Sequence, residues 1–442
     1  MIATFTAMLV EAWLPRAART HPERPAVNGM PYAELLRAAR EAAAALAARG
    51  VGPGDRVALA LAPGTDFVVA LHAAWLLGAV VVPHDLRLTA AERPPAGHVI
   101  ERVERADAGS GDSSDPGALT SGPDARADTH DLDAPALGLQ TSGTSGAPKP
   151  VTLTFGNLLW SALGSAAALG VEPGDTWLCT LPLSHVGGLS IVVRSAIYAT
   201  HALVHGRFET GPALAALHSE GVTLVSLVPT TLQRLLDAGL ADPPALRCAL
   251  LGGAPVAPAL QRRAQAAGIP VAQTYGLTEA CSQVTTQTPG DTAADAGPAL
   301  FCTRVRIGPD GEIQVSGPTV AGGGELPTGD LGELDAGGRL TVTGRKADTI
   351  VTGGENVAPI EVEAVLAEHP AVAEAAVHRR ADATWGEAVV ATVVLHAGAT
   401  ATAEALRAHC AARLAAFKVP KELAFAAALP RTPSGKLLRR AL

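Results

Sequence analysis

The sequence has few charged residues, and this shortage excludes two classes of protein. Charged residues make up 17% of the 442 positions and hydrophobic residues 48%, and the mean hydropathy is +0.23. A disordered acidic or basic binding protein has the opposite balance, so we expect a compact globular chain of several domains or subdomains. The net charge of −8 at pH 7 gives no overall attraction for nucleic acid or anionic lipid, and we expect neither as a partner.

Cysteines and long hydrophobic runs are also scarce. The five cysteines include no CxxC pair and no nearby histidine at zinc-ligand spacing, so we expect reduced thiols rather than disulfides or a zinc site. The longest apolar run, Ala70 to Pro83, contains His72 and is too short to cross a bilayer. The first residues, MIATFTAMLVEAWLP, lack the basic region and the cleavage site of a signal peptide. We therefore expect a cytoplasmic protein without a membrane span.

Alternating helix and strand patterns make up much of the chain. Residues 32–49 carry apolar side chains at the spacing of one helical face, and strand patterns at 56–61 and 80–83 flank a second helix at 65–77. After residue 150 the same alternation predicts helices at 157–169, 188–198, 230–236 and 258–267, and strands at 176–181, 202–205, 222–228 and 248–251. These patterns predict an α/β fold with largely parallel sheets that helices cover on both faces.

Three stretches depart from this alternation. Residues 104–135 are rich in Asp, Ser, Gly, Pro and Ala, and we expect a flexible surface excursion there. Residues 300–344 hold short β patterns between glycine-rich turns, which predict a small antiparallel β layer or barrel. The last ~100 residues have the size of a separate domain. Their patterns predict a small α+β domain with helices at 360–368 and 403–414 and strands at 372–378 and 388–395.

The segment from Thr141 to Lys149, TSGTSGAPK, is the sharpest local signal. Its two glycines and four hydroxyl side chains predict a loop whose N–H and O–H groups surround phosphate oxygens, with Lys149 as a positive charge. No Walker A pattern is present, which disfavours a P-loop kinase or NTPase. A plain Ser/Gly linker is the alternative interpretation.

Further short motifs follow in order along the chain. They are LPLSH ending at His185, GGAP from Gly252, YGLTE from Tyr275, TGD ending at Asp330, GRKAD from Gly344, GGEN from Gly353 and PRTPSGK ending at Lys436. Singly, each has an ordinary structural explanation, such as a turn residue, a helix-start carboxylate or a solvated lysine. Together and in this order they resemble the adenylate-forming superfamily of acyl-CoA synthetases, peptide-synthetase adenylation domains and luciferases. The resemblance runs from about residue 20 to the C-terminus.

Within that superfamily, LPLSHVGGLSIVVRSAIY, VSLVPTTLQRLLD and YGLTEACSQV are most similar to the o-succinylbenzoate:CoA ligases of menaquinone biosynthesis. The resemblance implies two half-reactions: a carboxylate attacks the α-phosphate of ATP to give acyl-AMP and pyrophosphate, and the thiol of CoA then displaces AMP. It implies ATP, Mg²⁺ and CoA as substrates and cofactors. It also implies an N-terminal domain over 1–344, a hinge at 345–347 and a mobile C-terminal domain over 348–442. At this hinge the family usually carries Asp or Lys, whereas this chain has Ala347.

The resemblance assigns roles to individual residues. Glu279 is the expected Mg²⁺ ligand, Thr278 binds the α-phosphate, and Lys436 acts in adenylation alone; His185 is a fourth catalytic candidate. A transition state that gathers negative charge on phosphate oxygens needs such donors and cations. The nucleotide-binding candidates are Thr141, Ser142, Gly143, Thr144, Ser145, Gly146, Lys149, Gly252, Gly253, Ala254, Tyr275, Gly276, Asp330 and Arg345. Gly353 and Gly354 are expected to line the pantetheine tunnel.

Our expectation about the carboxylic acid substrate depends on Arg194. It lies on a largely apolar helix, where a side chain that reaches the surface is the ordinary explanation. o-Succinylbenzoate has two carboxylates, and the one that is not activated needs a counter-charge, whereas a fatty-acid pocket has no use for a buried cation. Ser282 and Gln283 are expected to add polar contacts to this substrate.

Three other functions stay open at this point. One is another aryl or medium-chain acyl-CoA ligase, and a second is a stand-alone adenylation enzyme that loads a carrier protein. The sequence reaches Leu442 without a fused carrier domain, which disfavours the second. The third is a degenerate homologue that binds adenylate without catalysis, and the intact Glu279, Asp330 and Lys436 disfavour it. No segment is typical of an oligomer interface, so the oligomeric state is open.

Overall fold

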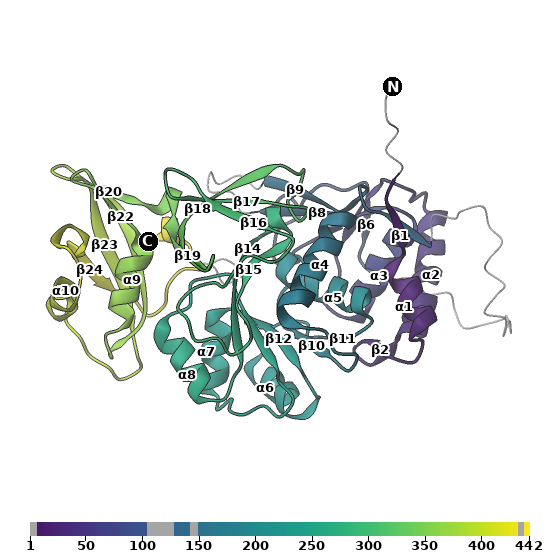
Figure 1. Cartoon of the computed structure of the whole chain (residues 1–442), viewed down its shortest axis with the longest axis horizontal. Coiled ribbons are helices and arrows are strands. Elements are labelled where there is room, and N and C mark those ends of the chain that lie inside the picture. The colour runs from purple at the N-terminus through teal and green to yellow at the C-terminus, as the bar shows by residue number, and fades with distance from the viewer. Residues whose placement is uncertain (1–6, 104–127, 142–148, 432–436) are drawn as a thin grey trace, which may run out of the picture.

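Two parts of unequal size lie end to end in the computed structural model (Figure 1). The structure describes residues 7–103, 128–141, 149–431 and 437–442. The smaller part contains the C-terminal elements, and the chain ends close to the junction between the two parts (Figure 1). Among the described residues, none of the helices has both the length and the apolar character that crossing a membrane requires.

A sheet of eight strands forms the centre of the larger part. Its order is β15 (Ser282–Thr286), β14 (Val271–Leu277), β13 (Cys248–Leu251), β12 (Leu224–Leu227), β10 (Thr176–Cys179), β11 (His201–Val204), β2 (Pro25–Val27) and β3 (Met30–Pro31). The strands from β14 to β2 are parallel, and the edge strands β15 and β3 are antiparallel to their neighbours. The predicted parallel sheet is therefore confirmed.

Helices cover both faces of this sheet because side chains along each strand alternate between the faces. In β12, Val225 and Leu227 belong to one apolar core and Leu224 to another. The first core lies under α6 (Thr210–Ser219), α7 (Pro229–Asp237) and α8 (Pro258–Ala266). The second lies under α4 (Phe155–Leu169) and α5 (Val186–Tyr198). The predicted helices within this part of the chain all form, with bounds that differ by a few residues, whereas α6 was not predicted.

A second sheet shares the core of α4 and α5. Its order is β6 (His98–Ile100), β4 (Arg56–Leu59), β5 (Val80–Pro83), β8 (Pro135–Thr141) and β9 (Lys149–Thr154), and only β9 is antiparallel to its neighbour. The helices against it are α1 (Trp13–Thr20), α2 (Tyr32–Ala48) and α3 (Thr65–Leu76). The predicted βαβ unit is formed by β4, α3 and β5.

The expectation of a surface excursion over 104–135 is wrong at its C-terminal end. Residues 129–131 form β7, which pairs in antiparallel fashion with β1 (Leu9–Glu11). His130 is buried and its ring stacks on Phe155 at 4.1 Å between centroids, and Leu132 is buried as well. The polar composition concealed two core side chains because a short strand needs only alternate residues to face inward. Residues 104–127 lie outside the described part of the chain.

Two buried histidines in this region predict a loss of stability in acid. Burial lowers the pKa of His72 to about 4, and burial together with the charge of His72 lowers the pKa of His130 to about 3. A histidine in the unfolded chain has a pKa near 6.5. Below that pH the unfolded chain binds more protons than the folded one, so the free energy of unfolding falls as pH falls. We expect the free energy of unfolding to drop by about 4 kcal/mol between pH 7 and pH 5 from these two groups.

Urea denaturation at the two pH values measures this drop. In His72→Leu the drop should be about half as large, because one of the two titrating groups is gone and an aliphatic side chain tolerates the buried position. An unchanged pH dependence in His72→Leu would contradict the assignment.

A small sheet and the C-terminal domain complete the fold. The small sheet has the antiparallel order β16 (Arg304–Ile307), β17 (Glu312–Ser316), β18 (Glu325–Leu334) and β19 (Leu340–Arg345), as predicted. The C-terminal domain contains β20 (Ile350–Thr352), β21 (Glu355–Val357), β22 (Val372–Asp382), β23 (Gly386–Leu395) and β24 (Glu422–Phe425) with α9 (Pro359–Ala367) and α10 (Ala403–Ala411). Its own apolar core supports the predicted α+β domain.

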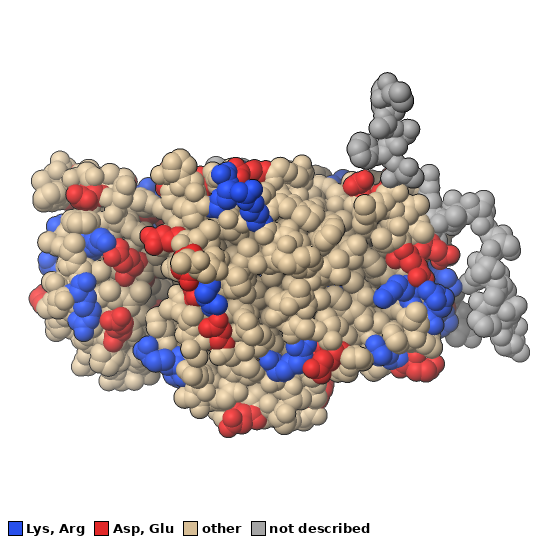
Figure 2. Space-filling model, viewed as in Figure 1, with Lys and Arg blue, Asp and Glu red and all other residues tan. Residues whose placement is uncertain are grey.

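Acidic and basic side chains are interspersed on the face of the molecule that Figure 2 shows. No broad field of one sign covers this face, in agreement with the small net charge of the chain. The feature that would attract a nucleic acid backbone is therefore lacking on this face.

Candidate functional site

Five of the candidate residues of the larger domain lie where two parallel strands end. Gly252, Gly253 and Ala254 directly follow β13, and Tyr275 and Gly276 are among the last residues of β14. Because the carboxyl ends of adjacent parallel strands meet at one edge of a sheet, the two motifs become neighbours in space. Such an edge is where open α/β sheets bind their ligands.

The backbone geometry at this edge explains why two of its residues are glycines. Gly253 has a φ of +81°, a conformation that other residues rarely adopt. At Gly276 a β-carbon would lie 1.7 Å from the carbonyl oxygen of Ser282 in the paired strand β15. Side chains at these positions are excluded by the backbone itself, so both motifs keep a bare backbone beside the strand ends.

Tyr275, Asp330 and Arg345 form one hydrogen-bonded cluster. The hydroxyl of Tyr275 donates to Asp330 Oδ2 at 2.9 Å, and Arg345 Nε donates to Asp330 Oδ1 at 2.8 Å. Burial and the nearby Asp330 raise the pKa of Tyr275, so its hydroxyl stays protonated and keeps donating. Burial opposes the charge of Arg345, but Asp330 outweighs it and raises the pKa of the guanidinium. The carboxylate is thus held in one orientation between β14, β18 and β19.

Thr278 and Glu279 lie on a single 3₁₀ turn, residues 278–280, between β14 and β15. The turn is anchored on both sides: Ala321 donates its N–H to the carbonyl of Glu279 at 2.8 Å, and Ser161 Oγ donates to the carbonyl of Cys281 at 2.6 Å. Cys281 and Ser282 follow with φ of +55° and +89°. Backbone of this kind is strained in non-glycine residues and is often found at ligand sites.

The donor set around this turn fits Mg²⁺ better than a transition metal. Among the described residues, no group of three or more His, Cys, Asp or Glu side chains is arranged to hold a metal ion. Mg²⁺ is usually held by one or two carboxylates together with phosphate oxygens of the substrate. A single carboxylate at Glu279, next to the end of β14, is compatible with that mode of binding.

Arg194 is one of the most deeply buried side chains of the protein, with a relative exposure of 2%. Its Nη2 donates to Ser161 Oγ at 3.2 Å, and the guanidinium lies 5.7 Å from the ring centroid of Trp177. Nε has no hydrogen-bond partner, and no carboxylate within the described part of the chain forms an ion pair with the group. Burial lowers the pKa of Arg194. The surface explanation is therefore wrong: this is a buried cation for which the described residues supply no carboxylate partner.

The position of Arg194 connects it to the turn of Glu279. Ser161, which accepts from Arg194, is the same side chain that holds the carbonyl of Cys281. Gln283, two residues after Cys281, is 1% exposed and donates from Nε2 to Thr286 Oγ1 at 2.9 Å. Its Oε1 has no partner among the described residues. Ser282, the first residue of β15, is half-buried.

His185 lies directly before α5. Its charge contributes to a lowered pKa of Asp85, whose main cause is the hydrogen bond from Arg87. Asp85 comes shortly after β5, so His185 is near the carboxyl end of that strand.

Thr141 and Lys149 are the ends of a hairpin. They are paired residues of β8 and β9, with Thr141 Oγ1 at 3.4 Å from the carbonyl oxygen of Lys149. The strands on either side of the segment are thus paired with each other, and the phosphate-loop interpretation stays a prediction. The candidates Ser142, Gly143, Thr144, Ser145 and Gly146, and also Lys436, lie outside the described residues.

Gly353 and Gly354 are on a different sheet, in the turn between β20 and β21 of the C-terminal domain. A β-carbon at Gly353 would lie 2.8 Å from the ring of Trp385, which is 48% exposed. Lys421 Nζ lies 5.1 Å from the centroid of the same ring. An exposed indole with a lysine over it was not predicted, because the two residues are far apart in the sequence.

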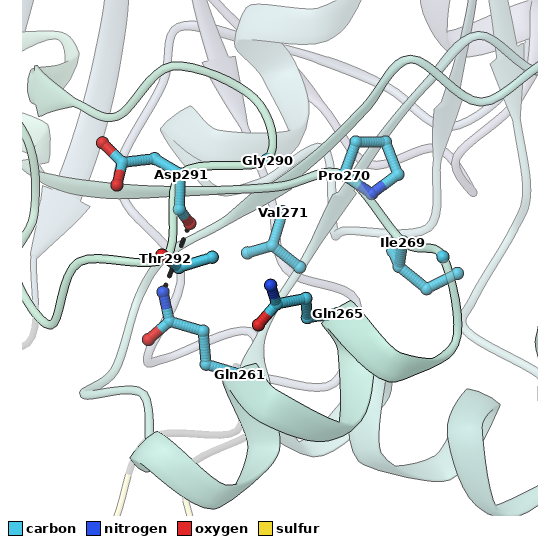
Figure 3. Close-up of a pocket in the computed structure, with 9 residues that line it drawn as sticks. Gln261, Gln265, Ile269, Pro270, Val271, Gly290, Asp291 and Thr292 are labelled. Carbon is cyan, nitrogen blue, oxygen red and sulfur yellow. Dashed lines mark hydrogen bonds between the residues drawn. The ribbon is translucent and has the colours of Figure 1, made fainter.

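A cavity of about 140 Å³ lies at the other end of β14. Figure 3 shows its lining from α8 and from the loop after β15, where Gln261 donates to the carbonyl of Asp291 at 3.3 Å. Val271, the first residue of β14, lines it, whereas the candidates Tyr275 and Gly276 are near the other end of that strand. This cavity is therefore separate from the candidate site.

Two models of known families match the chain. The model described as "AMP-binding enzyme" matches residues 14–96 and 93–326, and the "AMP-binding enzyme C-terminal domain" matches residues 361–436. Among curated proteins, the 2-succinylbenzoate–CoA ligase of Geobacillus kaustophilus is 39% identical, with 97% of this chain and 96% of that protein covered.

The o-succinylbenzoate CoA synthetase of Bacillus subtilis is similar in structure. In complex with ATP and magnesium ion it matches with a TM-score of 0.87 at 34% identity, covering 98% of this chain and 100% of that one. In complex with its acyl-adenylate intermediate the TM-score is 0.86 at 35% identity, and 98% of both chains is covered. A double mutant of the same protein, bound with a product analogue, matches with a TM-score of 0.69 at 35% identity and the same coverage.

Proposed function

Since the chain belongs to the AMP-binding enzyme family, we propose that it activates a carboxylic acid with ATP and transfers the acyl group to CoA. The acid is 2-succinylbenzoate, and the products are its CoA thioester, AMP and pyrophosphate. The observation that carries this conclusion is the match to 2-succinylbenzoate–CoA ligases over nearly the full length of both chains. The enzyme thus belongs to the AMP-forming acid–thiol ligases.

Adenylation is carried out by the strand edge of the larger domain. One carboxylate oxygen of the acid attacks the α-phosphorus, the bond to pyrophosphate breaks, and acyl-AMP forms. Mg²⁺, when bound, supplies positive charge that neutralises phosphate oxygens, and Glu279 would hold it. Thr278 offers a hydroxyl to the α-phosphate, and Lys149 a positive charge at the end of the hairpin loop. These side chains do no covalent chemistry; they orient the phosphate and stabilise its charge.

The nucleoside is placed by the cluster around Asp330. Tyr275 and Arg345 hold this carboxylate in one orientation, so its free lone pairs are directed before the ribose arrives. The ring of Tyr275 offers a face for adenine beside the bare backbone of Gly252 and Gly253. Preorganisation of this kind lowers the entropy that binding costs.

The acid is recognised through Arg194. A guanidinium that is fully desolvated and has no carboxylate partner among the described residues is unfavourable in the unliganded protein. The second carboxylate of 2-succinylbenzoate supplies the missing charge, while the first reacts. A medium-chain fatty acid has no group for this position, so the buried arginine supports the dicarboxylic acid over that alternative.

The two domains pivot at Ala347. On one side, Arg345 is bound to Asp330 and Lys346 is bound to Asp310 at 2.6 Å, both within the larger domain. On the other side, Asp348 lies 3.3 Å from Arg439 in the C-terminal domain. Ala347 is the residue between these two attachments. The TM-score to the form with a product analogue is lower than that to the acyl-adenylate complex at equal coverage, which supports a second arrangement of the domains.

CoA is bound by the C-terminal domain in the second half-reaction. Gly353 and Gly354 leave a narrow, side-chain-free path for pantetheine. Trp385 beside them offers a flat surface and Lys421 a positive charge for the nucleotide end of CoA. We place the enzyme in the cytoplasm, where ATP and CoA are available, and the five free thiols support this location.

Glu279→Gln tests the metal-binding role. An amide oxygen is a poorer ligand for a hard cation, so we expect kcat to fall by about 100-fold and the Mg²⁺ concentration for half-maximal rate to rise. Steady-state pyrophosphate release at increasing Mg²⁺ measures both effects. Glu333→Gln, an exposed carboxylate on β18, is the matched control and should behave as the parent protein. Near-normal turnover of Glu279→Gln would assign Glu279 to structure alone.

The reaction type is tested by the nucleotide product. With 2-succinylbenzoate, CoA and MgATP, the purified protein should release AMP and pyrophosphate in equal amounts. Formation of ADP and phosphate would contradict an acyl-adenylate intermediate. Acyl-AMP that accumulates and is not consumed on addition of CoA would favour the carrier-loading alternative.

A further inference from the structure

We propose that Ser161 is a positioning residue for substrate specificity, because it holds the guanidinium of Arg194 in the orientation that binds the second carboxylate of the acid. This inference rests on the proposed function, in which Arg194 recognises that carboxylate. Ser161 lies on α4 and Arg194 on α5, and each is 2% exposed. The bond between them is therefore shielded from water, where a hydrogen bond to a charged group is strong.

The two hydrogen bonds of Ser161 leave its hydroxyl one orientation. Its Oγ donates to the carbonyl oxygen of Cys281 at 2.6 Å and accepts from Nη2 of Arg194 at 3.2 Å. A hydroxyl has a single proton, a carbonyl oxygen can only accept and a guanidinium can only donate. The proton of Ser161 therefore points to Cys281, and a lone pair points to Arg194. The bond to the carbonyl also polarises the hydroxyl and makes it a better acceptor.

The position of this hydroxyl does not depend on Arg194. In the first turn of α4, Asn157 Nδ2 donates to the carbonyl of Pro318 at 2.7 Å and fastens the helix to the chain before β18. Ser161 follows four residues later, on the same side of the helix. Its acceptor, Cys281, is held in a left-handed conformation with a φ of +55°. The fold thus places the hydroxyl before any acid binds.

The described residues offer Arg194 no second group that fixes its direction. Its hydrogen bond to Ser161 is the only one that these residues provide, and Nε has no partner. The ring centroid of Trp177 lies 5.7 Å from the guanidinium. A ring face attracts a cation but does not select the direction of its N–H bonds. Without the hydroxyl, the guanidinium would be free to turn within its site.

The groups next to Arg194 carry no charge that could replace the hydroxyl. Burial raises the pKa of the Tyr198 hydroxyl and of the Cys281 thiol to about 12, although Arg194 opposes both shifts. Tyr198 also donates its proton to the carbonyl of Ala162. The cation therefore stays available for a ligand carboxylate, and the orientation that Ser161 sets decides where that carboxylate binds.

The reaction centre itself has other supports. The turn of Glu279 keeps the bond from the N–H of Ala321 to the Glu279 carbonyl at 2.8 Å and the pairing of β15 with β14. An acid without a second carboxylate makes no use of Arg194. Loss of the Ser161 hydroxyl should therefore affect the dicarboxylic acid alone.

The test compares two acids in Ser161→Ala. With 2-succinylbenzoate, kcat/KM for thioester formation should fall by about 10-fold or more, because a hydrogen bond to a charged group is lost. With 4-oxo-4-phenylbutanoate, the same acid without the ring carboxylate, it should stay within about twofold of the parent value. A defect of folding or of the catalytic turn would lower both values together. Equal losses for the two acids, or no loss for either, would overturn the proposal.

Arg194→Leu supplies a second readout. In that background, adding Ser161→Ala should change the ratio of the two kcat/KM values by no more than about twofold, because the serine acts only through the arginine. A further loss of preference of about tenfold in the double variant would show that Ser161 acts on the acid by another route, and would contradict the proposal.

Ser195→Ala is the matched control. Ser195 is also 2% exposed, and its Oγ has no hydrogen-bond partner among the described residues. This control should leave kcat/KM for both acids unchanged. If Ser161→Ala does not fold, the same comparison is made with Ser161→Cys, whose thiol fills the space but is a weak acceptor. We expect about a 3- to 10-fold loss for 2-succinylbenzoate alone. A parent protein that forms no thioester from either acid would instead contradict the proposed function.

Discussion

Replacing Lys436 with alanine is expected to abolish the formation of acyl-AMP from acid and ATP while the conversion of supplied acyl-AMP to the thioester continues. The transition state of adenylation places negative charge on the α-phosphate and on the attacking carboxylate, and a lysine beside them stabilises both. Loss of one such donor typically reduces a rate by about 100- to 1,000-fold, and a full positive charge lies at the upper end. The second half-reaction lacks this charge build-up at the same place.

The two rates are measured separately in a quench-flow experiment, once with acid and MgATP and once with purified acyl-AMP and CoA. Lys418→Ala is the matched control, because Lys418 is a lysine of the same domain that forms an ion pair with Glu361 at 2.6 Å. We expect this control to form acyl-AMP at the parent rate. A loss of equal size in both half-reactions of Lys436→Ala would show that the lysine has no role specific to adenylation.

Arg194→Leu is expected to reduce kcat/KM for 2-succinylbenzoate at least a hundredfold. Removing one partner of a largely desolvated ion pair costs about 3 to 5 kcal/mol, because the other charge is left buried without a partner. For 4-oxo-4-phenylbutanoate, which lacks the ring carboxylate, the same substitution should have little effect or even a favourable one. The ratio of the two kcat/KM values therefore isolates the contribution of the second carboxylate.

The stability of the unliganded protein supplies an independent readout for the same variant. In the structure, Arg194 has a single polar contact with Ser161 and no carboxylate partner among the described residues. Replacing such a cation with an aliphatic side chain should leave the free energy of unfolding unchanged or raise it. Arg234→Leu, at an exposed position of α7, is the control. It should change kcat/KM for either acid by no more than the equivalent of about 0.5 kcal/mol. A large loss of stability in Arg194→Leu would make the arginine structural.

The elements that the sequence predicted well are those with one strong apolar pattern. The strands Cys248–Leu251 and Val80–Pro83 form with the predicted bounds, because short continuous apolar runs between turns leave one interpretation. β14 and β15 were not predicted, because Val271–Leu277 and Ser282–Thr286 mix polar and apolar residues that tertiary contacts pair into a hairpin. His130 was assigned to an excursion for the same reason: its environment is set by residues distant in the sequence.

The parts of the candidate site that a short local motif encodes were predicted. The parts that depend on contacts between residues far apart in the sequence were missed. The positions of Gly253 and Gly276 beside a strand edge follow from backbone geometry, which a short motif encodes. The burial of Arg194 could only be expected through a resemblance, because a helix pattern does not tell which face meets a second sheet. The hydrogen bond from Arg194 to Ser161 joins residues 33 positions apart, and no local signal predicts it.

The most direct test of the function is the preference of the parent enzyme among acids. CoA thioester formation should be measured with 2-succinylbenzoate, 4-oxo-4-phenylbutanoate and octanoate under identical conditions. We predict that kcat/KM for 2-succinylbenzoate exceeds both others by at least about a hundredfold, because only this acid places a carboxylate against Arg194. A higher kcat/KM for octanoate, or equal values for the two aromatic acids, would contradict the assignment of the substrate.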